Sequence, residues 1–343
     1  MNPSFSTVFD GTSRNSFVTM ATAKFDPAPA MRHIKSSAPF IRTRANIFTK
    51  VSEEAFGNRM IKLGLCGTNN SHSVVFSRLV NVPDLPPNEK VDGASMVAFF
   101  AYDDENVAKL KELNVSVRVK EKEDLIPLVD GVLCVSRDGS KHLEEAVPFL
   151  EAGVPTFVDK PLATSLEDAR KIAATARRTG TPLMSCSSLR FAPEITSKEA
   201  RLKEISPLKT GTVTGMGETI FYGVHAAEMM SAVFGPGIDY VMNLGTEGHD
   251  LATVQYADGK TVSLQIIRDA KVDFRVIAHG ERGREEIAVE STLYYPETLR
   301  RVVEFVKTGK SPIDLNDTLE IITCLNGLVR SRETGGRIRL KDL

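Results

Sequence analysis

Residues 67–72, with the sequence GTNNSH, form a run of small and polar side chains between an apolar stretch and a segment of helical period. The amides and the dipole at a helix N-terminus favour anions, so a turn of this kind can hold a phosphate. Of the dinucleotide-binding pattern G-x-G-x-x-G only the first glycine, Gly67, remains, with Asn69 and His72 at the second and third glycine positions. Asparagine tolerates positive φ, so the turn stays feasible, although close approach of the backbone to phosphate is impaired. The placement between strand and helix predicts a nucleotide site, with Ser71 as the helix cap.

Two further side chains near this turn, His72 and Asp103, each allow two interpretations. His72 is expected at the positive end of the helix dipole, which favours a neutral, hydrogen-bonding imidazole, while a histidine that only packs against the sheet fits equally well. Asp103 ends the second strand, where a carboxylate hydrogen-bonds the adenosine ribose and repels a 2′-phosphate, which favours NAD over NADP. Asp103 lies 36 residues after Gly67, and the Pro-rich loop at residues 82–87 accounts for this long spacing. An ordinary helix-capping aspartate is the alternative.

Short strands alternate with helices from residue 60 to residue 185 and must position these side chains. Strands regularly separated by helices pair in parallel, so we expect a Rossmann-type doubly wound parallel sheet. The expected strands are Ile61–Cys66, Ser95–Ala101, Val115–Val119, Gly131–Val135, Thr156–Val158 and Leu183–Ser185, and the expected helices are Ser71–Val80, Glu105–Leu113, Glu123–Val129, Lys141–Ala152 and Leu166–Thr179.

Residues 186–343 change to longer strands of period two, which predicts a C-terminal α+β domain with a mostly antiparallel open sheet. Three helices, Ala226–Phe234, Glu297–Lys307 and Asn316–Ser331, are expected to cover one face of that sheet.

The composition is that of an ordinary globular protein of about two domains. The chain has 343 residues, with 43 basic and 44 acidic side chains and a formal net charge of −1, which argues against a nucleic-acid partner. No apolar run approaches the roughly 20 residues that span a bilayer, so no membrane insertion is expected. The four cysteines lie far apart without metal-ligand spacing, which predicts buried reduced thiols and no metal site.

Residues 1–59 are rich in Ser and Thr, and basic residues outnumber acidic ones. This composition fits an organelle transit peptide or a disordered tail, and a third possibility is that translation begins at Met60. We therefore expect a cytoplasmic protein, or an imported one if the leader is genuine.

Several ordered motifs together resemble the Gfo/Idh/MocA oxidoreductase family. The string VDKPLA at residues 158–163 resembles the family's E-K-P signature, and LRFAP at residues 189–193 resembles its R-F-x-P. Residues 130–135, with His142 downstream, are similar to the family's fourth strand and histidine-containing turn, and residues 306–312 and 331–335 look like its C-terminal signatures. The resemblance covers residues 60–340.

This resemblance implies a nicotinamide-dependent dehydrogenase that acts on sugars, cyclitols or related hydroxy compounds. Lys160 and His225 would carry the proton transfer, because oxidation of an alcohol needs a base for the hydroxyl proton while hydride leaves to the nicotinamide. The predicted cofactor-binding residues are Gly67, Thr68, Asn69, His72, Asp103, Ser136, His142 and Asp159, and the predicted substrate residues are Lys160, Arg190, Glu218, Tyr222 and His225. Arg190 would also fit a salt bridge, and Tyr222 a place in the core.

One departure from the family puts the redox chemistry in question. Many members have an aspartate four residues before the histidine, where this chain has Phe221. Lys160 and His225 could suffice, Glu218 could reach in from a turn, or the chemistry could be altered or lost. Two alternatives to a dehydrogenase follow: a non-catalytic nucleotide- or sugar-binding sensor, and redox-neutral glycoside cleavage assisted by NAD. The resemblance also implies a homo-oligomer formed through the second-domain sheet.

Overall fold

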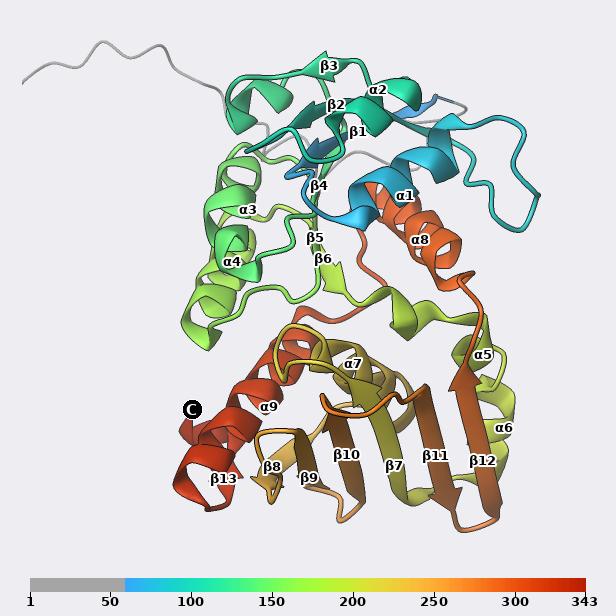
Figure 1. The fold of residues 1–343 in the computed structure, drawn as a ribbon, viewed down its shortest axis with the longest axis vertical. Coiled ribbons are helices and arrows are strands. Elements are labelled where there is room, and N and C mark those ends of the chain that lie inside the picture. The colour runs from blue at the N-terminus through green and yellow to red at the C-terminus, as the bar shows by residue number, and fades with distance from the viewer. Residues whose placement is uncertain (1–58) are drawn as a thin grey trace, which may run out of the picture. The chain divides into compact units, whose positions relative to one another are not determined.

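The computed structural model describes residues 59–343 (Figure 1). The predicted leader lies outside the described residues except for Arg59.

The first sheet has six strands in the order β3-β2-β1-β4-β5-β6, and every pair in it is parallel. The strand order reverses beside β1, and the predicted doubly wound sheet is confirmed. The strands are β1 (Ile61–Cys66), β2 (Ala94–Phe100), β3 (Val117–Arg118), β4 (Gly131–Cys134), β5 (Thr156–Asp159) and β6 (Leu183–Cys186).

Helices cover both faces of this sheet, as a doubly wound fold requires. One face packs against α1 (Ser71–Asn81), α2 (Val107–Glu112) and α8 (Tyr294–Thr308), and the other against α3 (His142–Glu151) and α4 (Leu166–Thr179). The expectation that the helix at 297–307 covers the second sheet was wrong, because Leu299, Val302 and Phe305 of α8 bury themselves in the first-sheet core beside α1 (Figure 1).

The predicted helix Glu123–Val129 is also absent, and a short 3₁₀ helix, η3 (Lys122–Leu125), stands there. Pro127 has no backbone N–H, so it cannot make the bond to the carbonyl of Glu123 that an α-helix needs.

The second sheet has seven strands in the order β12-β11-β7-β10-β9-β8-β13, and only the pair of β7 with β10 is parallel. The prediction of a mostly antiparallel sheet is therefore confirmed. The strands are β7 (Leu208–Met216), β8 (Ile238–Asn243), β9 (His249–Tyr256), β10 (Thr261–Ile267), β11 (Phe274–Gly280), β12 (Gly283–Val289) and β13 (Ile338–Arg339).

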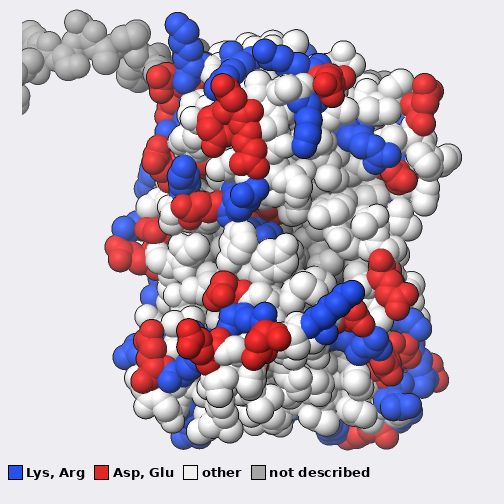
Figure 2. Space-filling model, viewed as in Figure 1, with Lys and Arg blue, Asp and Glu red and all other residues white. Residues whose placement is uncertain are grey.

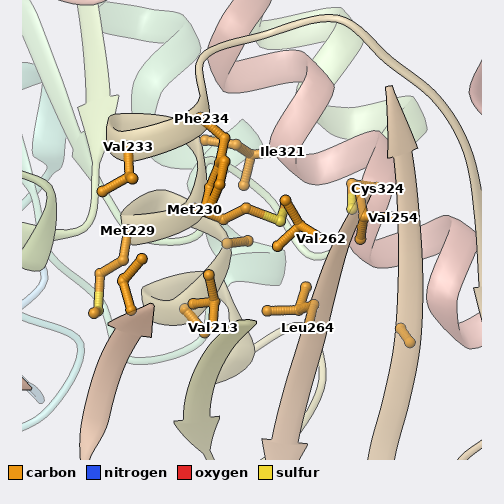
Figure 3. Packing of buried hydrophobic residues seen from close by; sticks show 14 of the residues in the cluster. Val213, Met229, Met230, Val233, Phe234, Val254, Val262, Leu264, Ile321 and Cys324 are labelled. Carbon is orange, nitrogen blue, oxygen red and sulfur yellow. The ribbon is translucent and has the colours of Figure 1, made fainter. Parts of the chain in front are cut away.

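Helices α7 (Gly223–Phe234) and α9 (Leu315–Thr334) pack on one face of the second sheet, with the short helices α5 (Pro193–Thr196) and α6 (Glu199–Ile205) toward its β12 end. Met230 and Phe234 of α7 meet Val213, Val262 and Leu264 of the strands (Figure 3). α7 begins three residues before the predicted start, so it carries His225 in its first turn.

Basic and acidic side chains are intermixed on the face shown in Figure 2, with no broad area of a single sign. Among the described residues, no helix is both long enough and apolar enough to cross a bilayer. All four cysteines are buried and unpaired, as predicted.

Candidate active site

A cavity of about 330 Å³ opens where the strands of the first sheet end. Its walls come from the turn after β1, the ends of β5 and β6, and the starts of α7 and α8, so both halves of the chain contribute. In doubly wound sheets this edge is where ligands bind. The lining residues are Asn70, Ser71, His72, Arg137, Lys160, Ser188, Leu189, Phe221, Tyr222, His225, Phe274, Tyr294 and Tyr295.

The turn between β1 and α1 requires its single glycine. Gly67 has φ +82°, and a Cβ at this position would lie 2.1 Å from Oγ of Ser136. Asn70, rather than the predicted Ser71, caps α1, because its side chain accepts a hydrogen bond from the amide of His72 at 3.2 Å. Ser71 instead occupies the first helical position and is exposed.

Polar side chains fix the rest of this turn. Asn69 does not adopt positive φ, contrary to the reasoning from sequence; its side chain accepts from the amide of Arg137 at 3.1 Å. Asn106, itself at φ 64°, donates to the carbonyl of Thr68 at 2.8 Å. The hydroxyl of Thr68 is buried and has no hydrogen-bond partner among the described residues.

Asp103 is exposed at the end of β2, and one of its carboxylate oxygens accepts from the amide of Glu105 at 2.9 Å. This contact closes a turn before α2, whose N-cap is Asn106, so Asp103 does not cap the helix as the alternative proposed. The other oxygen makes no hydrogen bond to the described residues, so a ribose contact stays a prediction.

Two predicted cofactor residues, Ser136 and His142, lie beneath the turn and do not face the cavity. The Ser136 hydroxyl donates to the buried carboxylate of Glu145. His142 is fully buried, with Nδ1 2.8 Å from the carbonyl of Pro161 and Nε2 3.2 Å from the carbonyl of Ser136. The His142 ring lies between two carbonyl acceptors, and its one N–H in the neutral form can donate to one of them, so a cofactor contact of Ser136 or His142 stays a prediction.

His72 pairs with Asp159 inside the cavity wall. Nδ1 of His72 lies 2.7 Å from Oδ2 of Asp159, and both side chains are buried. Burial would raise the pKa of the Asp159 carboxyl, but the His72 ring and the Lys160 ammonium outweigh burial and lower this pKa to about 2. The second oxygen of Asp159 is buried without a partner. Asp159 therefore acts on His72 and has no exposed atom to offer a cofactor.

The Lys160 side chain is 6% exposed and extends to the cavity. Its ammonium lies 4.6 Å from the ring centroid of Phe221 and 5.2 Å from that of Tyr222, without a hydrogen-bond partner among the described residues. Burial lowers the pKa of Lys160, although the Asp159 carboxylate opposes the shift. Such an ammonium is poised to donate to, or exchange a proton with, a bound hydroxyl.

His225 faces the same cavity from the first turn of α7, with Nδ1 2.6 Å from Oγ of Ser187. Burial, with the charges of Lys160 and His72, lowers the pKa of His225 well below its usual range. The imidazole is therefore neutral at pH 7. Tyr222 meets it edge-on, with ring centroids 5.2 Å apart, and is 39% exposed at the cavity, so the interpretation of Tyr222 as a core residue was wrong.

Two predicted substrate residues are not brought to this cavity. Arg190 forms a largely buried ion pair with Glu228 at 2.9 Å, which agrees with the salt-bridge alternative. Glu218 lines a separate cavity with Arg268 and Arg332, so it does not replace the acid missing at Phe221.

A family model described as an oxidoreductase family with an NAD-binding Rossmann fold, GFO_IDH_MocA, matches residues 61–186. The domain built on the first sheet belongs to the Gfo/Idh/MocA oxidoreductase family. No curated protein matches the sequence.

Solved structures resemble the chain along most of its length. A scyllo-inositol dehydrogenase from Lactobacillus casei with bound NAD(H) and scyllo-inositol has 15% identity and a TM-score of 0.70, over 82% of this chain and 100% of the other. A myo-inositol dehydrogenase from Corynebacterium glutamicum has 16% identity and a TM-score of 0.69, over 82% and 99%. GenD2 from gentamicin A biosynthesis, in complex with NAD, has 14% identity and a TM-score of 0.71, over 82% and 96%. At these identities the likeness establishes a shared fold.

Reasoning from sequence missed several residues that line or adjoin this cavity. Ser187 and Ser188 directly follow β6, and the rule that ligands meet the carboxyl ends of parallel strands could have found them. The Ser188 hydroxyl is buried without a partner. No sequence pattern indicated that Tyr294 and Tyr295 belong to the site, because only the packing of α8 on the first sheet brings them to the cavity.

Three buried side chains near the turn are of types that can bind a metal ion. The ligand atoms of Cys66, Cys134 and Glu145 lie within 4.8 Å of one another. Burial raises the pKa of both thiols, which disfavours the thiolates that a metal needs, and structural zinc sites use four ligands.

Proposed function

We propose that this protein is an NAD-dependent oxidoreductase that transfers hydride between the cofactor and a CH–OH group of a sugar, cyclitol or related polyol. One observation carries the proposal: Lys160 of the first-sheet domain and His225 of the second domain line the same cavity. An amine and an imidazole in that arrangement can bind and deprotonate a single hydroxyl group.

The residues around the β1–α1 turn fit a dinucleotide. Gly67 lets the backbone of the turn pass close to Ser136, and the first residues of α1, Ser71 and His72, line the cavity. The free oxygen of Asp103 would accept from a ribose hydroxyl and repel a 2′-phosphate, which favours NAD over NADP. The bound nicotinamide would supply the hydride acceptor for the oxidation.

The remaining cavity residues suit a hydroxylated ring. Lys160, His225 and Ser188 offer polar hydrogens, and the rings of Tyr222 and Phe274, which also line the cavity, lie 5.2 and 5.6 Å from the His225 ring in edge-on contacts. Aromatic faces pack against the apolar C–H face of a sugar or cyclitol while polar groups bind its hydroxyls. The names of the similar structures, inositol dehydrogenases and an aminoglycoside-pathway enzyme with NAD, point to the same substrate class.

A non-catalytic binding protein is the second candidate. The contact between the Lys160 ammonium and the Phe221 ring, at 4.6 Å, favours it, because a lysine held on an aromatic ring is less free to act on a hydroxyl.

Formation of NADH separates the two candidates. The full chain with NAD and a panel of probes, myo-inositol, scyllo-inositol and glucose among them, should produce NADH absorbance with at least one probe. Lys160→Met should abolish this turnover and leave NAD affinity, measured by calorimetric titration, nearly unchanged. Binding of NAD without turnover of any probe would favour the sensor, and failure to bind either NAD or NADP would overturn the proposal.

We also propose that the chain self-associates through the second sheet, whose strands alternate buried and more exposed residues. Light scattering that shows a monomer would contradict this.

A further inference from the structure

We propose that His72, oriented by Asp159, takes the hydroxyl proton of the substrate, and that His225 serves as a hydrogen-bond donor instead of the base. This inference rests on the proposed function and assigns the two histidines of the cavity opposite roles. Both roles follow from which ring nitrogen of each histidine is already committed to a protein partner.

The pairing of His72 with Asp159 fixes the first tautomer. Asp159 is ionised, so its carboxylate oxygen can only accept, and the His72 Nδ1 atom at 2.7 Å must carry the hydrogen. In the neutral imidazole, Nε2 of His72 then holds a lone pair. No other hydrogen bond of the His72 ring is formed with the described residues, and the ring lines the cavity. A carboxylate behind an imidazole is the arrangement that stabilises the imidazolium formed when a base accepts a proton.

The surroundings of Ser187 fix the second tautomer. The fully buried Ser187 hydroxyl oxygen accepts from the amide of Leu189 at 3.1 Å. Its own proton has one acceptor within hydrogen-bond distance among the described residues, Nδ1 of His225 at 2.6 Å. A buried hydroxyl donates wherever it can, so Ser187 donates to Nδ1. The neutral His225 ring therefore carries its hydrogen on Nε2 and presents an N–H, not a lone pair.

The residue type at Phe221, just before α7, agrees with a His225 ring that carries its hydrogen on Nε2. Phe221 has no carboxylate to hold a hydrogen on Nδ1 of His225, and the nearby acid Glu218 lines another cavity. The side chains packed around His72 include one carboxylate, Asp159 from β5, beside Asn70 of the turn and the rings of Phe76 and Tyr295. Among the described residues, the carboxylate in contact with His72 therefore comes from the first-sheet domain.

The oxidation step balances with these roles. The hydroxyl O–H bond breaks, its proton passes to Nε2 of His72, and its electron pair forms the second C–O bond of the carbonyl. A bound oxidised nicotinamide would accept the hydride from the same carbon. The Nε2–H of His225 and the Lys160 ammonium donate to the oxygen, and Asp159 stabilises the imidazolium of His72. Asp159 and Ser187 are positioning residues.

The tautomers can be measured without substrate. The full chain with ¹⁵N-labelled histidine gives long-range ¹H–¹⁵N spectra that distinguish a ring nitrogen with hydrogen from one without. His72→Gln and His225→Gln assign the two signals among the six histidines. We expect hydrogen on Nδ1 of His72 and on Nε2 of His225 at neutral pH. Ser187→Ala should alter the His225 pattern and leave that of His72 unchanged, and Asp159→Asn should do the reverse. The opposite tautomer at either histidine would overturn the assignment.

Kinetics with a probe that is turned over give the second test. Glutamine keeps an N–H donor near Nε2 but cannot act as a base, so the same substitution separates the roles. We expect His72→Gln to lower kcat by about 100-fold or more, as loss of a general base does. His225→Gln should cost no more than about tenfold, the scale of one altered hydrogen bond. Added imidazole should partly restore His72→Ala. The reverse order of the two Gln variants would overturn the inference.

Failure of this inference is distinct from failure of the proposed function. If NAD binds and a probe is oxidised while the tautomers or the Gln variants behave in the opposite way, only the roles of the histidines are wrong. If no NAD binds, the tautomer spectra still decide the hydrogen positions, but the proposed function falls.

Discussion

Replacing Lys160 by methionine should make the protein more stable while it destroys turnover. The lysine side chain is 6% exposed and its ammonium has no hydrogen-bond partner among the described residues. Methionine has a similar length and no charge, so Lys160→Met keeps the packing and removes the buried charge. A residue retained for function at a cost in stability should behave in this way.

The size of the effect follows from two opposing contributions. The Lys160 ammonium faces the cavity and is only partly removed from water, so its cost falls in the range of about 1–3 kcal/mol for a buried polar group without a partner. Contact with the rings of Phe221 and Tyr222 returns about 0.5–2 kcal/mol, and attraction to Asp159 adds to this. Because the pKa of Lys160 is lowered despite Asp159, the cost of burial is the larger contribution. We expect Lys160→Met to raise the free energy of unfolding by about 1 kcal/mol at pH 7.

Urea unfolding of both proteins at several pH values measures this difference. The folded-state pKa of Lys160 lies below that of the unfolded chain, so between the two values the unfolded chain binds the extra proton. Wild-type stability therefore gains from this group as the pH rises through that window, and the variant lacks the gain. The advantage of Lys160→Met should be largest at neutral pH and should shrink toward about pH 10.4, the ordinary lysine value.

Lys260→Met is the matched control. The Lys260 ammonium also lies over a ring, 4.5 Å from the Tyr256 centroid, but it has a carboxylate partner in Asp258 at 2.6 Å. Its replacement should lower stability by up to about 1 kcal/mol and leave turnover unchanged. If Lys160→Met instead destabilises the protein by 1 kcal/mol or more on the same scale, the ammonium is a structural partner and the reasoning is refuted.

The remaining predictions concern the supports of the site. Gly67→Ala should lower the free energy of unfolding by about 2–4 kcal/mol and weaken NAD binding, because its Cβ meets Ser136 at positive φ. Gly180→Ala, also at positive φ but with no atom within 4 Å, should cost only about 1 kcal/mol; equal losses would exclude the clash. Arg190→Met should cost about 3 kcal/mol at pH 7 in urea unfolding, because it leaves the buried Glu228 carboxylate unpaired. Burial raises the pKa of Glu228, so protonation should relieve this loss as the pH falls, and a loss independent of pH would contradict the ion-pair role.

Local patterns predicted the fold well where they were complete. Helix α4 matches its predicted bounds residue for residue, because Ser165 caps its start and Gly180, at φ 69°, ends it. The alternation of strands and helices predicted the parallel sheet. The sheet against which α8 packs could not be predicted, because its apolar face could cover either sheet and only the tertiary structure decides which one it covers.

Two predicted catalytic residues line one cavity, but their contacts were not predicted. Lys160 and His225 follow from motifs, but the pairing of His72 with Asp159 joins residues 87 positions apart. This contact depends on the strand order β1-β4-β5, because that order places the ends of β1 and β5 two strand spacings, or about 10 Å, apart. The contact of Ser187 with His225 likewise joins the loop after β6 to the first turn of α7. Such pairings depend on three-dimensional neighbours, which single-chain spacing does not encode.

A crystal structure of the full chain soaked with NAD would test the central claim most directly. We expect the pyrophosphate at the amides of residues 67–72 and the nicotinamide ring beside Lys160, within reach of one small molecule that also contacts His225. A dinucleotide bound elsewhere, or a complex in which side chains fill the space between Lys160 and His225, would contradict it.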